Sequence, residues 1–179
     1  MSTCNITSGF ALGCRDNTGG IKALYILSGS ISAITDTLNE ISDISGSGVF
    51  YQFDLQRNTS DFTETINGST ENGTVFYEST VNAVFAKLQT STRNQIKVLA
   101  ANPDLKIIVE TNNDVSGSKF FYVGRVHGAQ LNSGQGQSGT SIGDANGYTL
   151  SFSSQEPNPA DVIVGTTLAD ALTGITISQ

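Results

Sequence analysis

Apolar residues recur at every second position in two stretches of this 179-residue chain, and this pattern constrains its fold most strongly. The first stretch contains Val49, Tyr51, Phe53 and Leu55, and the second contains Val75, Tyr77, Val81, Ala83 and Phe85. Because successive side chains of a strand point to opposite faces, each stretch predicts a strand with one apolar face. Residues 67–73 between them contain two Asn-Gly pairs, which predict a hairpin turn.

Between the two stretches the apolar residues move from odd to even positions, since Phe62 and Ile66 come next. Such a change requires a bulge or a break in the strand, which we place at residues 57–59. The polar side of these predicted strands contains Gln52, Asp54, Asp61, Thr63, Glu78, Thr80 and Asn82. The sequence therefore predicts a long central hairpin with one apolar and one polar face.

The remaining elements follow from shorter patterns. Apolar runs bounded by turn residues predict strands at 21–27, 105–111, 119–126, 148–152 and 161–164, and a helical turn at 167–172, and Ile175 and Ile177 form a final apolar pair. Residues 89–101 predict one helix, because Ile96, Leu99 and Ala100 form a stripe that can pack on a sheet. Thr90 or Ser91 is the expected N-cap, and Asn102-Pro103 the expected end. Residues 28–48 predict irregular structure or a short strand, and 128–143 a long polar loop.

Composition indicates a mainly β protein of one domain. Charged residues make up 14% of the chain, hydrophobic residues 37%, and there are 19 glycines, so strands and turns are favoured over long helices. The net charge of −7 argues against a basic surface that binds nucleic acid. No apolar run approaches the about 20 residues of a membrane helix, so no membrane partner is expected.

No pattern of residues predicts catalysis, and we expect no enzyme, cofactor or metal site. His127 is the only histidine, and no nucleophile motif accompanies it. Residues 134–139 match the glycine string of dinucleotide-binding turns, but no helix is predicted after them. Cys4 and Cys14 are expected to be free thiols in a reducing cytosol, with a disulfide between them as the alternative outside the cell. With one histidine they are too few to hold a metal.

The segment between Val49 and Leu88 contains five carboxylates but only two cations, Arg57 and Lys87. The acids are Asp54, Asp61, Glu64, Glu71 and Glu78. They are compatible with an ordinary solvated hairpin face. They are equally compatible with an acidic lining that repels a polyanion over about one Debye length, ~8 Å at physiological salt. Composition leaves both interpretations open.

Several stretches resemble the tail-tube, or major tail, proteins of tailed bacteriophages. They are Val75-Phe-Tyr-Glu-Ser-Thr, Phe85-Ala-Lys-Leu running on to Thr92-Arg-Asn-Gln-Ile-Lys-Val-Leu-Ala, Leu105-Lys-Ile-Ile-Val-Glu, Phe121-Tyr-Val-Gly-Arg, Gly143-Asp-Ala-Asn-Gly-Tyr-Thr-Leu-Ser-Phe before Glu156-Pro, and Gly19-Gly-Ile-Lys-Ala-Leu-Tyr-Ile. The resemblance implies a β-sandwich or half-barrel with one flanking helix, as a single domain over residues 1–179.

In that family six subunits form a ring and contribute pairs of hairpin strands to an inner β-barrel. Rings stack into a tube through loops and terminal segments, which here would be residues 1–20 and 165–179. The resemblance thus implies a virion tail protein, assembled in the host cytoplasm, whose partners are itself and other tail proteins. Genomic DNA would pass through the lumen without specific binding. The alternative is another β-sandwich virion component that acts as a binding module, such as a fibre, decoration, baseplate or terminator ring protein.

The polar side of the predicted strands would then face this lumen. The lumen-lining candidates are Gln52, Asp54, Asp61, Thr63, Glu78, Thr80 and Asn82. The alternation of residues assigns them, and the resemblance implies only that a lumen exists.

Overall fold

Strands dominate the computed structural model, which describes residues 8–11, 13, 15–114, 117 and 119–179. Cys4 and Cys14 lie outside the described residues. The strands are β1 (Ile21–Thr37), β2 (Glu40–Asp54), β3 (Asp61–Ser69), β4 (Thr74–Ala86), β5 (Ile107–Thr111), β6 (Phe120–Val123), β7 (Gln130–Gln137), β8 (Gly147–Glu156), β9 (Asp161–Ile163) and β10 (Leu172–Ser178). The helices are α1 (Thr90–Ala101) and the short 3-10 helix η1 (Leu168–Ala171). The predicted mainly β class is confirmed.

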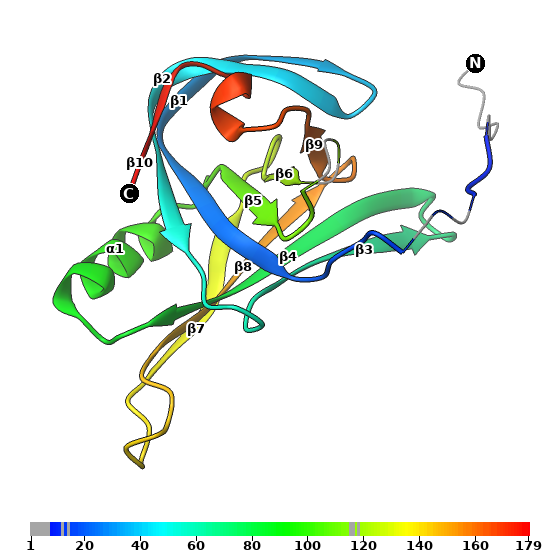
Figure 1. Cartoon of the computed structure of the whole chain (residues 1–179). Coiled ribbons are helices and arrows are strands. Elements are labelled where there is room, and N and C mark those ends of the chain that lie inside the picture. Colours follow the sequence, from blue (N-terminus) through cyan, green and yellow to red (C-terminus); the bar gives the residue numbers. More distant parts are fainter. Residues whose placement is uncertain (1–7, 12, 14, 115–116, 118) are drawn as a thin grey trace.

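Five strands close into a small barrel. They pair in the order β1-β5-β6-β9-β2, and β2 pairs again with β1, while β10 adds in parallel to β2 (Figure 1). The barrel interior is filled by large apolar side chains, among them Phe50, Ile108 and Tyr122. Closure of the ring leaves few free strand edges in this part of the molecule.

The remaining four strands form a separate antiparallel sheet in the order β3-β4-β8-β7, which packs against the outside of the barrel (Figure 1). Val81 and Phe152 of this sheet are fully buried against Leu24 and Val109 of the barrel. Alternate residues of β1 therefore face two different cores, one inside the barrel and one between the barrel and the second sheet. This explains why Ala23–Leu27 is continuously buried.

The prediction of irregular structure or a short strand at residues 28–48 was wrong. These residues continue β1 and β2 into one long hairpin, turned by Leu38 and Asn39 with φ of 52° and 66°. Two successive positive φ values are typical of a hairpin turn whose twist matches its strands. The strands were not recognised because serine and glycine are frequent here, and only Ile31, Ile34, Ile41 and Ile44 of this part belong to the barrel core or pack against it.

Two glycines that face each other bend this hairpin over the barrel. Gly29 pairs with Gly48, and their φ values of 153° and 130° are rare for residues with a side chain. A Cβ atom on Gly48 would overlap the carbonyl oxygen of Ser28. The close approach of the two strands therefore requires glycine at this level of the hairpin.

Gly48→Ala is expected to lower the free energy of unfolding by about 2 kcal/mol or more, because it adds backbone strain and a steric overlap. Urea denaturation followed by circular dichroism measures this change. Gly143→Ala is the matched control, since no atom lies within 4 Å of its added Cβ, and it should change stability by less than about 0.5 kcal/mol. Equal stability of the two variants would contradict this role of Gly48.

The break predicted at residues 57–59 is a change of sheet rather than a bulge. β2 ends at Asp54 in the barrel, and β3 begins at Asp61 in the second sheet. The central hairpin therefore consists of β3 and β4 alone, and β2 is paired with β1, β9 and β10 instead. Alternation in the sequence specifies the faces of a strand but not the sheet to which it belongs.

The loop predicted at 128–143 was also wrong, because it contains edge strand β7. Gly134 and Gly136 lie beneath Leu150 and Tyr148 of β8: a Cβ on either glycine would come within 2.7 Å or 2.9 Å of those side chains. The glycine string thus makes room for large neighbours in a sheet and opens no helix. Only residues 138–146 form the connecting turn.

The predicted helix is confirmed within one residue at its start, and Asn102 is its C-cap. Ile96 and Leu99 are half-buried and pack on the core between barrel and sheet, as predicted, whereas Ala100 is exposed. The expected cap by Thr90 or Ser91 was wrong, because Gln89 occupies the N-cap position without a side-chain hydrogen bond. None of the described helices is both long and apolar enough to cross a membrane.

Candidate functional site

One face of the β3-β4-β8-β7 sheet is mainly polar, with Phe76 and Val84 of β4 as apolar members, and we call it the polar face. Strand register places its residues opposite one another across all four strands. They are Asp61, Thr63 and Thr65 of β3; Glu78, Thr80 and Asn82 of β4; Thr149, Ser151, Ser153 and Gln155 of β8; and Gln130, Ser133, Gln135 and Gln137 of β7. No lysine, arginine or histidine is among them. The opposite face carries Val81, Leu150 and Phe152, which are buried.

Side-chain hydrogen bonds run across the strands of the polar face. The Asn82 amide donates to both carboxylate oxygens of Asp61, at 3.1 and 3.3 Å, and its carbonyl accepts from the Ser151 hydroxyl at 2.9 Å. Gln155 donates to Glu78 at 3.4 Å. Both carboxylates on this face are therefore held by neutral donors, so their negative charges are not neutralised by a cation of the face.

The structure brings five of the seven predicted lumen residues together. Asp61 lies opposite Asn82, and Thr63 lies opposite Thr80, with Glu78 next along β4 on the same face. Gln52 and Asp54 are separated from them, because β2 belongs to the barrel. There Gln52 donates to Asp54 at 2.8 Å. The alternation in the sequence therefore assigned to one surface residues that belong to two different sheets.

Nine of the fourteen named residues of the polar face were not identified from the sequence. The residues of β8 do alternate, since Thr149, Ser151 and Ser153 flank Leu150 and Phe152, so this part carried a readable signal. The residues of β7 gave no such signal, because glycines occupy the inward positions where apolar residues would reveal a strand.

The acidic set identified in the sequence is divided by the fold. Only Asp61 and Glu78 lie on the polar face. Glu64 points to the other side of β3 and accepts the backbone N–H of Ala160 at 2.7 Å. Glu71 lies in the exposed turn between β3 and β4. An acidic lining would thus consist of two carboxylates per chain in a surface that is otherwise neutral.

Both edges of this sheet are free in the described part of the chain: β3 pairs only with β4, and β7 pairs only with β8. The Val84 N–H donates to Ser60 on the β3 side, and the Lys87 N–H donates to the Asn146 carbonyl on the β8 side. Backbone groups of successive strand residues point to opposite edges, so even-numbered residues of β4 bond to β3. The β3 residues opposite them, Asp61, Thr63 and Thr65, therefore direct their backbone N–H and C=O groups to β4. Phe62, Glu64 and Ile66 direct theirs to the free edge.

An ionic cluster lies at the end of the barrel where the tip of the β1–β2 hairpin meets β9. Arg125 donates to Asp161 at 2.9 Å and to both oxygens of Asp36, at 2.9 and 3.1 Å, and thereby joins the tip of the β1–β2 hairpin to β9. Hydrogen bonding from Arg125 lowers the pKa of Asp36, while burial raises the pKa of Asp161. Arg125 is therefore the group that makes an ionised, buried Asp161 tolerable.

Arg125→Gln is expected to lower the free energy of unfolding at pH 7 by about 3 kcal/mol, because it leaves the Asp161 carboxylate buried without a cation. The stability that Asp36 gains from its lowered pKa is present above its ordinary value of 3.8 and is lost as the pH falls below it. The deficit of the variant should therefore shrink as both carboxyls become protonated in acid. Urea denaturation between neutral and acidic pH measures it.

Lys97→Gln is the control, because it removes the same charge from an exposed position of α1. It should change stability by less than about 0.5 kcal/mol at every pH. A deficit of Arg125→Gln that stays constant from neutral to acidic pH would contradict the role given to Asp161.

Other titratable groups have structural partners. Glu110 is buried in the barrel wall, where Lys22 donates to it at 2.8 Å and Tyr25 at 2.7 Å. Burial raises the pKa of Tyr25. His127 lies in an exposed turn, with Nδ1 at 2.9 Å from the carbonyl oxygen of Gln155. Among the described residues, no group of three or more His, Cys, Asp or Glu side chains is arranged to hold a metal ion.

Comparison with known proteins leaves the polar face as the basis for a functional assignment. No protein-family model, curated protein or solved structure matches this chain.

Proposed function

We propose that this chain is a virion structural protein that self-assembles into rings and tubes, with the polar face lining a bore through which DNA passes. The observation that carries the proposal is a four-stranded sheet with one buried face, one polar face and two unpaired edges. The resemblance to tail-tube proteins of tailed bacteriophages supports it independently.

Free edges favour closure by neighbouring copies. All three pairings in the sheet are antiparallel, so β3 and β7 run in opposite directions at its two edges. If β3 of one copy pairs with β7 of the next, the antiparallel alternation continues around a ring without a mismatch. Such closure satisfies the exposed backbone groups of both edges.

The dimensions of such a ring suit a DNA duplex. Six copies, the number in the resembling family, would supply about 24 strands. With strands about 4.8 Å apart and tilted by about 40°, they would close at a backbone diameter of about 48 Å. Polar side chains of modest size would line this bore and leave a wide water-filled channel.

The chemistry of the polar face suits passage better than binding. Proteins hold DNA mainly through lysine and arginine, which displace counterions from phosphates, and the polar face has neither. Its two carboxylates repel phosphates at short range, while hydroxyl and amide groups keep the surface hydrated. A polyanion would therefore slide along this surface without strong attachment points.

Purified protein is expected to form rings and tubes with an open central channel. Negative-stain electron microscopy and light scattering over a range of concentrations test this expectation. Rings without tubes would favour the alternative of a terminator or baseplate ring. Monomers at every concentration, with neither rings nor tubes, would contradict the proposed function.

A further inference from the structure

Asparagine is followed by glycine three times in the chain, and the fold gives each pair a different setting. The pairs are Asn67-Gly68 in β3, Asn72-Gly73 in the turn between β3 and β4, and Asn146-Gly147 where β8 begins. Such a pair is reactive, because the glycine nitrogen is unhindered and can attack the side-chain amide of the asparagine before it. The attack requires the backbone to bend until the nitrogen reaches the amide carbon, so backbone freedom decides whether it occurs.

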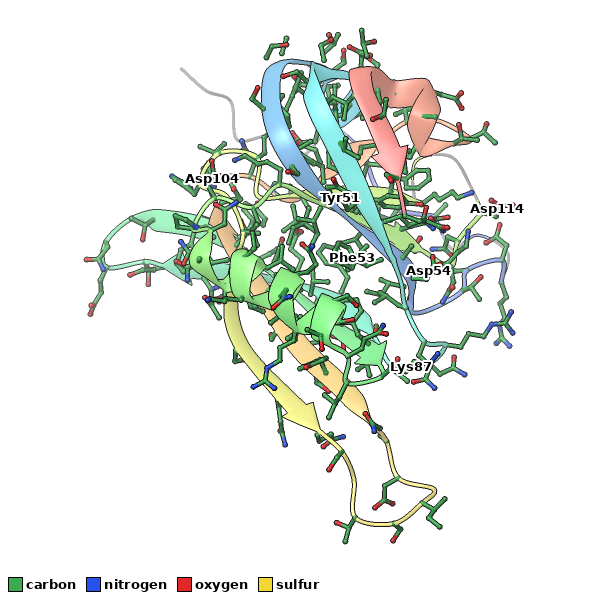
Figure 2. The ribbon with its side chains drawn as sticks, turned by 90° about the vertical axis from the view of Figure 1, so that its left-hand side faces the viewer. Tyr51, Phe53, Asp54, Lys87, Asp104 and Asp114 are labelled. Atoms are coloured by element: carbon green, nitrogen blue, oxygen red, sulfur yellow. The ribbon has the colours of Figure 1, made fainter. Side chains whose placement is uncertain are left out.

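Asn72-Gly73 has the most open of these settings. Residues 70–73 are all exposed, and the β3–β4 hairpin projects from the body of the molecule with this turn at its far end (Figure 1 and Figure 2). The side-chain amide of Asn72 makes no hydrogen bond within the described part of the chain, and its backbone N–H donates to the Ser69 hydroxyl at 3.3 Å. No atom lies within 4 Å of a Cβ added to Gly73. Both reacting groups are therefore free to move.

Asn146 is held in place although it is also exposed. Its side-chain oxygen accepts the Leu88 N–H at 3.0 Å, and its backbone carbonyl accepts the Lys87 N–H at 2.7 Å. Figure 2 shows Lys87 where β4 ends beside β8. Gly147 is buried, and a Cβ on it would overlap the carbonyl oxygen of Phe85. The glycine nitrogen therefore cannot approach the amide carbon unless this part of the sheet opens.

Asn67 is held by strand pairing. It lies opposite Phe76 of β4, and Gly68 lies opposite Val75. Its amide also donates to Glu78 at 3.5 Å. Because a paired strand is extended, the hairpin must open before the backbone can bend at this pair.

We propose that Asn72 is a site of spontaneous deamidation in the folded protein, and that the sheet protects Asn67 and Asn146. The Gly73 nitrogen loses its proton to solvent and bonds to the side-chain carbonyl carbon of Asn72. The C–N bond of the amide then breaks and releases ammonia, which leaves a succinimide ring. One water opens this ring at either carbonyl and gives aspartate or isoaspartate. Water is the only co-reactant, and nothing is oxidised or reduced.

The reaction changes both the charge and the length of the turn. Each event adds one carboxylate beside Glu71, and isoaspartate also lengthens the backbone by one carbon atom. Aged protein therefore becomes a mixture of copies that differ at this turn. This reactivity belongs to the single chain and does not depend on the proposed function.

Peptide mass spectrometry of folded protein aged in neutral buffer tests the assignment. Asn67 and Asn72 fall in the same tryptic peptide, which follows Arg57 and ends at Lys87, so fragmentation distinguishes them. Asn72 should convert at least about tenfold faster than Asn67 or Asn146, because only the latter two require the sheet to open. Equal rates at Asn72 and Asn146, or no conversion at Asn72, would overturn the proposal.

Unfolded protein is the control for the sequence itself. In urea all three pairs should convert at similar rates, because glycine follows each asparagine and the sheet no longer protects any of them. A preference for Asn72 that persisted in urea would mean that neighbouring sequence selects the site, and would overturn the role given to the fold.

Asn72→Gln is the matched variant. Glutamine would have to close a larger ring, so folded Asn72→Gln should no longer accumulate the acidic form that isoelectric focusing detects in the unmodified protein. Accumulation of acidic forms at the same rate in both proteins would overturn the assignment to Asn72.

Discussion

Ile66→Pro should abolish tube and ring formation while leaving the subunit folded. Ile66 lies on edge strand β3 and directs its backbone N–H to the free edge, so the substitution removes no hydrogen bond to β4. Proline at this position blocks pairing with β7 of a neighbouring copy, because it lacks the donor and its ring fills the edge. The side chain of Ile66 is 67% exposed, so the free energy of unfolding should fall by no more than about 1 kcal/mol.

Light scattering and electron microscopy measure assembly, and circular dichroism measures the fold. Ile66→Ala is the matched control, because it shortens the same side chain but keeps the N–H group, and it should assemble normally. If the folded proline variant assembled as well as the alanine variant, copies would not join through the edge of β3.

Thr80→Lys should make the assembled tubes retain DNA in their central channel. Thr80 lies at the centre of the polar face, opposite Thr63 and Ser153 on the two neighbouring strands. Six copies would place about six lysines in one ring, and about six phosphate contacts weaken by about 10³-fold between 50 and 200 mM salt. Tubes of the variant should therefore hold short duplex DNA at low salt and release it at high salt, while unmodified tubes hold none.

Fluorescence anisotropy of labelled duplex DNA measures this retention. Thr176→Lys is the matched control, because it makes the same substitution at an exposed position of β10, on the barrel rather than on the polar face. It should not produce salt-dependent retention. Equal retention by both variants would mean that DNA does not contact the polar face in preference to the barrel.

The strands with apolar alternation could be predicted from the sequence, because burial of one face imposes a readable period. β4, β8 and the end of β2 are of this kind, and α1 was evident from Ile96 and Leu99. β7 and the β1–β2 hairpin beyond Leu27 could not be predicted, because glycine and serine replace the apolar residues that would reveal a strand. At the glycine positions, neighbouring backbone or large side chains lie too close to admit a larger residue. Gly48 and Gly136 are examples: they look like loop residues in the sequence and are strand residues in the fold.

The polar face was predictable in part for the same reason. Alternation correctly placed Asp61, Thr63, Glu78, Thr80 and Asn82 on one face. It could not exclude Gln52 and Asp54, because the assignment of β2 to the barrel depends on pairings with distant segments such as β9 and β10. The ionic cluster of Asp36, Arg125 and Asp161 depends on tertiary contacts of the same kind, since its members are far apart in the sequence.

Cryo-electron microscopy of the assembled protein, at a resolution that shows strands and side chains, tests the central claim most directly. We expect β3 of each copy to pair with β7 of the next, with Thr80 and Ser153 directed into a continuous channel. A particle in which the polar face lies on the outside, or in which copies join through the barrel and leave β3 and β7 unpaired, would contradict it.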